Sequence, residues 1–302
     1  MSDRSSFLRL IARRAGQLIT SCALVFLAWA LYQQWGAISH WRPTKAQIAL
    51  FAVLAFSYSG ALMLLAFNWV IIVQTLIAQS PPRAALLLSY TKTQIAKYVP
   101  GNVVHLVSRH MYLRNFGLNH RSLATGSLLE LLSLPLAAVT AICLVMPLVD
   151  ESYLGPWEMD ALAPPFFIAA VGVSTLAIWR AQRSWHLPAI IVVCRGVVFM
   201  MCQGIIFAVV LYIVSGSFVA LAIPAAIFAW LVGFLTPGAP GGIAVREALL
   251  VSLLTHVAAD DTVLIAALIL RMTTTVGDLI LYLFGNLVLM KYVPEITDDR
   301  RQ

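Results

Sequence analysis

The chain has 302 residues, of which 61% are hydrophobic and 11% are charged, whereas soluble domains are roughly half apolar and a quarter charged. With a mean hydropathy of +0.87, this composition excludes a water-soluble enzyme, a disordered chain and a collagen-like chain. The net charge of +7 does not indicate nucleic-acid binding, because the basic residues flank or interrupt apolar segments instead of forming a stripe interleaved with aromatic residues. The sequence therefore predicts an all-α, polytopic membrane protein.

Six stretches are apolar enough to be read as spans of a bilayer whose hydrocarbon core is about 30 Å thick. We expect full spans, in chain order, at about residues 17–32, 47–78, 122–149, 165–178, 188–214 and 262–290. The first stretch follows Arg9, Arg13 and Arg14 as a signal peptide would, and we expect it to be retained as an anchor. The whole chain, 1–302, is then a single membrane domain.

Two further apolar regions are interrupted by proline and glycine. Residues 84–112 are split at Pro100-Gly101, and residues 218–254 are split at Pro237-Gly238-Ala239-Pro240-Gly241-Gly242. Proline removes a backbone donor and glycine lowers helix propensity, so a continuous helix is not expected through either break. We expect two re-entrant segments.

The distribution of lysine and arginine predicts the orientation of the spans. Twelve of these residues lie on segments assigned to the cytoplasm, namely Arg4, Arg9, Arg13, Arg14, Arg83, Arg114, Arg121, Arg180, Arg183, Lys291, Arg300 and Arg301. Only Arg42 and Lys45 lie in loops on the other side. Both termini, 1–16 and 291–302, are therefore expected in the cytoplasm, and each broken region should return to the face from which it enters.

Proline, glycine and arginine recur at identical offsets in the two broken regions. Pro100-Gly101 is followed by Arg109, and Pro237-Gly238 is followed by Arg246. Because the two regions have opposite expected orientations, this pattern is compatible with an inverted repeat of the kind that builds a binding site at the membrane midplane in transporters. Coincidence between two helices that contain Gly and Pro is the alternative.

Charged residues inside the apolar stretches are the candidate site residues. Each costs about 3 kcal/mol near the bilayer centre on insertion scales, so it should face a partner, a polar interior or water. The basic members are Lys92, Lys97, Arg109, Arg195, Arg246 and Arg271, and the acidic members are Glu130, Glu247 and Asp278. Arg195 is close enough to a span end to reach the interface, and Lys92 lies on a segment compatible with an interfacial position. Arg271 and Asp278 share a helix face but are too far apart to pair, so we expect each to have a partner elsewhere.

The excess of cations in this set predicts an anionic ligand. The planar guanidinium group suits phosphate or carboxylate, and helices that restart after the breaks would point positive N-terminal ends inward. A lipid can keep its tails in the bilayer while its head group is sheltered, so we expect lipid translocation. Arg109, Arg246 and Arg271 would hold the head group, Glu247 and Asp278 would orient them, and Glu130 and Asp278 could also carry protons.

The residues at the breaks also resemble a known family. Lys97-Tyr98-Val99-Pro100-Gly101 with Arg109, the segment from Pro237 to Glu247, and Arg271 are similar to the lysylphosphatidylglycerol synthase transmembrane-region family. The resemblance implies a flippase-like membrane domain with re-entrant segments, in the cytoplasmic membrane of a bacterium or an archaeon. It also implies head-group contacts at Lys97, Pro100, Gly101, Arg109, Pro237, Gly238, Gly241, Gly242, Arg246, Glu247 and Arg271.

The chain departs from that family in two respects. Glu130 is followed by Leu131, where the family often has Glu-Arg, so the substrate is expected to differ. There is also no soluble aminoacyl-transferase segment, so we expect no synthase activity and no enzyme.

Two other functions stay open at this stage. A membrane glycosyltransferase could use Asp150, Glu151, Glu158 and Asp160 as bases or metal ligands, although a solvated acidic loop is the simpler interpretation. A scaffold for envelope-biosynthesis enzymes would not need the buried arginines. We expect no metal, because His105 and His110 have no further ligand at suitable spacing, and no nucleotide cofactor, because no phosphate-binding loop is present. The expected partner is a membrane lipid, with a homodimer left open.

Overall fold

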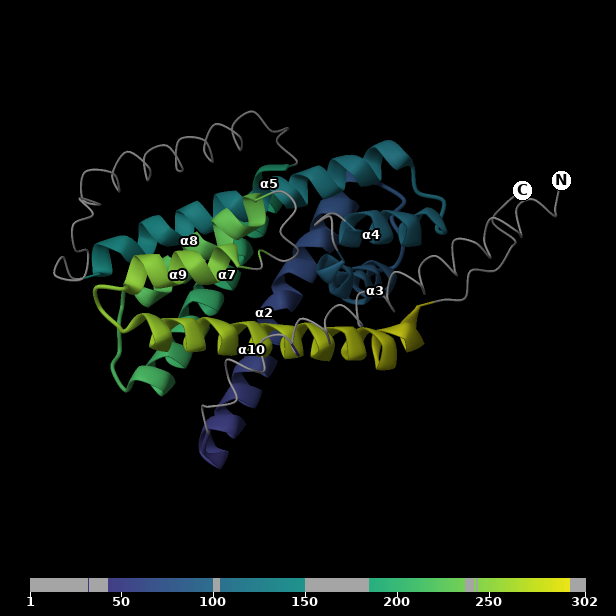
Figure 1. The fold of residues 1–302 in the computed structure, drawn as a ribbon. Coiled ribbons are helices and arrows are strands. Elements are labelled where there is room, and N and C mark those ends of the chain that lie inside the picture. The colour runs from purple at the N-terminus through teal and green to yellow at the C-terminus, as the bar shows by residue number, and fades with distance from the viewer. Residues whose placement is uncertain are drawn as a thin grey trace.

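The computed structural model describes Tyr32 and residues 43–99, 104–149, 185–236, 242 and 244–293. Within these residues every regular element is a helix, as Figure 1 shows. The all-α class predicted from the sequence is therefore confirmed for the described part of the chain.

Four of the described helices are long and apolar enough to cross a membrane. They are α2 (Lys45–Leu76), α5 (His120–Val145), α7 (His186–Ser215) and α10 (Asp260–Leu287). The short 3-10 helices η2 (Met146–Leu148) and η6 (Leu289–Tyr292) follow α5 and α10. These helices lie within a few residues of four predicted spans and fit a multi-pass membrane protein. The other two predicted spans, 17–32 and 165–178, fall outside the described residues apart from Tyr32.

The two broken regions form pairs of short helices. The first contains α3 (Arg83–Thr93), the 3-10 helix η1 (Gln94–Tyr98) and α4 (Val104–Arg114), and the second contains α8 (Ala222–Leu235) and α9 (Val245–Leu254). At 1.5 Å per residue, none of them is long enough to cross the hydrocarbon core alone. The interruptions fall where the sequence predicts them, while Pro100, Gly101, Pro237, Gly238 and Gly241 themselves lie outside the described residues.

Local sequence signals explain where the long helices begin and end. Thr44 and Gln47 form a reciprocal capping box at the start of α2, and the Asn119 side chain accepts a hydrogen bond from the backbone of Arg121 at the start of α5. Gly216 ends α7 in the left-handed conformation, with φ of 76°, a backbone geometry that glycine adopts without steric cost.

Helices α2 and α7 form the central pair of the bundle, and each of them packs against both α5 and α10. Figure 1 shows α2 crossing the direction of α10, with its first turns extending beyond that helix. Glycine allows the closest crossings. A Cβ atom on Gly277 of α10 would lie 2.8 Å from the carbonyl oxygen of Ala55 in α2, and one on Gly204 of α7 would lie 2.8 Å from that of Ile223 in α8. Small residues at such crossings let membrane helices approach closely.

The order of elements occurs twice, because a long helix, two short helices and a second long helix run from α2 to α5 and again from α7 to α10. The packing follows the same pattern. When α2, α3, α4 and α5 are exchanged with α7, α8, α9 and α10, every pair of α-helices in substantial contact maps onto another such pair. For example, α3 packs against α10, and α8 packs against α5. The described helices therefore form two halves with equivalent packing.

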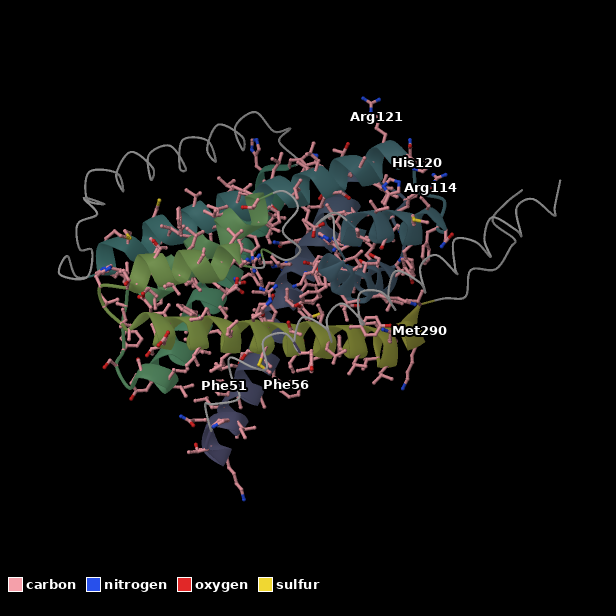
Figure 2. All side chains as sticks on the ribbon, in the orientation of Figure 1. Phe51, Phe56, Arg114, His120, Arg121 and Met290 are labelled. Atoms are coloured by element: carbon pink, nitrogen blue, oxygen red, sulfur yellow. The ribbon has the colours of Figure 1, made fainter. Side chains whose placement is uncertain are left out.

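The outer surface of the bundle exposes many large apolar side chains. Large exposed apolar side chains occur on all four long helices, among them Phe56 on α2, which Figure 2 labels. Arg114, His120 and Arg121 gather at the turn between α4 and α5 (Figure 2). Such extensive apolar exposure is unfavourable in water and suits a lipid environment.

Candidate functional site

A cavity of about 120 Å³ lies in the middle of the bundle, where every described α-helix contributes to its wall. Five of the lining side chains are charged, and these are Lys97, Glu130, Arg246, Glu247 and Arg271. Aromatic side chains form much of the remaining wall, among them Tyr58, Tyr90, Tyr98, Phe199, Trp230 and Phe234. An apolar cavity with a few convergent polar groups is the usual form of a ligand site.

The starts of the short helices α4 and α9 face this cavity. His105 is the second residue of α4, Arg246 and Glu247 are the second and third residues of α9, and all three line the cavity. The helix dipole places partial positive charge at these N-terminal ends. The two breaks therefore direct both helix starts and charged side chains to one place.

Lys97 and Asp278 form the first buried ion pair. Lys97 Nζ lies 2.8 Å from Oδ1 and 2.7 Å from Oδ2 of Asp278, and the hydroxyl of Tyr98 donates a hydrogen bond to Oδ2 at 2.5 Å. These bonds fix η1 of the first half to α10 of the second half. The carboxylate of Asp278 thus orients a lysine, whereas the sequence led us to expect an arginine.

Arg109 and Glu130 form the second pair, with Nη1 of Arg109 2.5 Å from Oε2 of Glu130. The guanidinium group lies 4.0 Å from the ring centre of Tyr90 and 4.8 Å from that of Trp69, and Arg109 is completely buried. Glu130 lines the cavity but Arg109 does not. The structure therefore places Arg109 behind the cavity wall, where it holds Glu130, and not at the position expected for a head-group ligand.

Arg271 and Glu247 form the third pair, with Nη1 of Arg271 2.6 Å from Oε1 of Glu247. Glu247 Oε2 is buried and has no hydrogen-bond partner in the described part of the chain. The sequence predicted that Arg271 and Asp278 would each pair with a residue outside their own helix, and both pairs confirm this.

Arg246 makes no ion pair with any residue that the structure describes. Its Nε is buried without a hydrogen-bond partner, and its guanidinium lies 5.6 Å from the ring centre of Trp230. A guanidinium remains protonated in proteins. The cavity therefore contains a positive charge with a free donor.

Two glycines hold the Arg246 side chain in place. A Cβ atom on Gly233 of α8 would lie 2.7 Å from Cγ of Arg246, and one on Gly242 would lie 2.6 Å from Nε. Gly242 also has φ of 73°, which disfavours any other residue there. Gly242 was predicted as a site residue, but Gly233 was missed, because its only signal in the sequence is a glycine inside a helix.

Three uncharged side chains bring further unpartnered atoms to the cavity. Oε1 of Gln94, Oε1 of Gln203 and Nδ1 of His105 are buried and make no hydrogen bond within the described residues. These groups could bond to a neutral polar part of a ligand.

The other sequence candidates lie away from the cavity or outside the described residues. Lys92 and Arg195 do not line the cavity, and Arg195 lies 5.8 Å from the ring centre of Phe67. Asp150, Glu151, Glu158 and Asp160 fall in residues that the structure does not describe. In the described ranges, no group of His, Cys, Asp and Glu side chains could hold a metal ion.

Comparisons with protein-family models, with curated protein sequences and with solved structures find no match to this chain. The interpretation of the site therefore rests on its own geometry.

The Lys97–Asp278 pair gives a test of buried-charge pairing. Replacing Asp278 with Leu leaves the ammonium of Lys97 without its partner, so we expect the free energy of unfolding to fall by about 3–5 kcal/mol. The double variant Lys97→Met/Asp278→Leu removes both charges and should recover much of this loss. Thermal unfolding of the single and double variants in the same detergent measures the difference. A double variant that is less stable than Asp278→Leu would contradict the pairing.

Proposed function

We propose that the protein binds the anionic head group of a membrane lipid in this cavity and moves the lipid between the two leaflets. The observation that carries the proposal is Arg246, which makes no ion pair with the described residues and whose Nε has no hydrogen-bond partner among them, beside three complete ion pairs. Because each pair is neutral as a unit, the excess positive charge of the cavity belongs to Arg246.

An isolated cation in this position is costly unless a ligand compensates it. Ion pairs and hydrogen bonds offset the cost of burying the other charges, whereas the Nε of Arg246 is desolvated with no bond in return. An oxygen of a phosphate or carboxylate would supply the missing acceptor and the missing negative charge. A phospholipid brings this group into the bilayer while its tails stay in hydrocarbon. The resemblance of the two break motifs to a flippase-like family supports the same proposal.

We propose further that the chain has six full spans and two re-entrant segments, arranged as an inverted repeat. The equivalent packing of the two halves supports this arrangement. The residues that line the cavity support it as well. Several of them form pairs whose two members are separated in the sequence by as many residues as Pro100 and Pro237. These matched positions are Leu62 and Phe199, Lys97 and Phe234, Glu130 and Ala267, and Leu134 and Arg271. Inverted repeats place a site at the midplane, where rocking of one half against the other exposes it to each side in turn.

The orientation of the repeat can be tested with single cysteines. In a variant that lacks the four native cysteines, we expect Ser217→Cys after α7 to react with a membrane-impermeant maleimide in intact cells. Asn115→Cys between α4 and α5 should react only after permeabilisation. Both native side chains are exposed, so accessibility does not depend on unfolding. Labelling of both positions from the same side would contradict the inverted arrangement.

The central test of function is lipid scrambling in proteoliposomes by the Arg246→Gln variant. The loss of a charge-assisted hydrogen bond should slow movement of fluorescently labelled phosphatidylglycerol by about tenfold to a hundredfold. Arg195→Gln is the matched control, because Arg195 also lies within an apolar stretch but does not line the cavity. Wild-type rates in a folded Arg246→Gln protein would refute the assignment of the site, and no movement by the wild-type protein would refute translocation.

A complementary test adds a carboxylate to the second half of the bundle, at the position matched to Glu130. The position matched to Glu130 in the second half is Ala267, so Ala267→Glu should give Arg246 a partner as Glu130 does for Arg109. We expect this variant to remain folded and to lose most lipid movement, because the internal carboxylate replaces the lipid anion. Ala267→Gln has nearly the same volume without the charge and should retain more of the activity. Equal loss in both variants would show that crowding, and not charge, is responsible.

A further inference from the structure

The unpartnered atoms of the cavity differ in the kind of hydrogen bond that they need. Arg246 Nε requires an acceptor, whereas Oε1 of Gln94, Oε1 of Gln203 and Oε2 of Glu247 require donors. Gln94 and Gln203 are 8% and 5% exposed, so water outside the protein does not satisfy them. A ligand that completes the cavity must therefore carry an anionic oxygen and several O–H or N–H groups.

The charge of the cavity limits the ligand further. Lys97–Asp278, Arg109–Glu130 and Arg271–Glu247 are each joined at 2.5–2.8 Å. Moving a proton within such a pair leaves the pair neutral, so the described side chains at the cavity carry one excess positive charge. A ligand with one negative charge neutralises it. A zwitterionic lipid leaves one positive charge buried, and a phosphomonoester or diphosphate with two or more charges leaves an uncompensated negative charge.

The size of the cavity favours a small polar group. A cavity of 150 Å³ accommodates benzene, so about 120 Å³ takes a phosphate group and a few adjoining atoms. An oligosaccharide would not fit in this space.

From donors, charge and volume together we infer that the cavity selects a lipid phosphodiester with a single negative charge and a small, neutral, hydroxylated head group. The phosphodiester oxygen accepts from Arg246, and the head-group hydroxyls donate to Gln94 and Gln203. This inference rests on the proposed function and specifies its substrate class. Two sources share this chemistry, a glycerol-bearing phospholipid and a polyprenyl phosphate that carries one neutral sugar, of which the phosphate and the adjoining hydroxyls would enter the cavity.

The test is a comparison of lipids in proteoliposomes of the full-length protein, with the fluorophore on an acyl chain so that the head group is native. Phosphatidylglycerol should move at least tenfold faster than phosphatidylethanolamine, which has donors but no net charge, and faster than phosphatidic acid, which has charge but no head-group hydroxyl. If the natural ligand is the polyprenyl lipid, unlabelled polyprenyl-phosphate hexose should slow the movement of phosphatidylglycerol. If the natural ligand is the glycerophospholipid, it should have no effect on that rate. Equal rates for the three phospholipids would overturn the selectivity while leaving translocation intact. No movement of any lipid would refute the proposed function itself.

A charge substitution makes the selectivity test independent of a general loss of activity. Gln203→Glu nearly preserves the shape of the side chain and adds a negative charge, which makes the cavity neutral as a whole. We expect the ratio of phosphatidylglycerol to phosphatidylethanolamine rates to fall by about tenfold, with phosphatidylethanolamine gaining in absolute rate. Gln74→Glu on α2, outside the cavity, is the matched control and should leave the ratio unchanged. An unchanged ratio in Gln203→Glu would overturn the inference, because charge matching would then not determine which lipid enters.

Discussion

The cost of burying charge in a low-dielectric environment is the constraint on which the interior of this protein depends. Four cations and three carboxylates meet in the centre of a bundle whose outer surface is apolar, and each carboxylate bonds to one of the cations. These pairs also fix the architecture, because each joins a short helix to a long one. Charge pairing here positions the broken segments, and the hydrophobic effect alone could not do this, since lipid tails are as apolar as leucine.

The two halves of the bundle are equivalent in packing but not in charge. Arg109 and Arg246 occupy matched positions, yet Arg109 pairs with Glu130, whereas the position matched to Glu130 in α10 is Ala267. The first arginine is therefore structural, and the second is left available. Similarly, Asp278 binds Lys97, while the matched position to Asp278 in α5 is Ala141. The charges at the cavity thus differ between two halves whose packing is equivalent.

Much of the fold could be predicted from the sequence, and less of the site. Hydropathy locates α2, α5, α7 and α10 within a few residues, because apolar length is a local property and the bilayer thickness fixes its scale. The Pro-Gly breaks are local signals as well. The pairing of charges is not local, since Lys97 and Asp278 are 181 residues apart, and only the packing of η1 on α10 brings them together. For the same reason, Arg109 was expected from the sequence to bind the ligand, and the close approach of Gly233 to Arg246 was not expected.

Gly233 shows how the side chain that we propose to bind the lipid is supported. Arg246 follows the second break, where Ala244 and Gly242 both have positive φ, and a long side chain in such a place loses considerable rotamer entropy when it is fixed. The two glycines leave a slot that confines the stem of the side chain, while Trp230 lies beside the guanidinium. Because this entropy is lost when the protein folds, it is not lost again when a ligand binds, and more of the interaction energy remains for recognition. The unpaired charge is thus held in advance in the geometry that an anion needs.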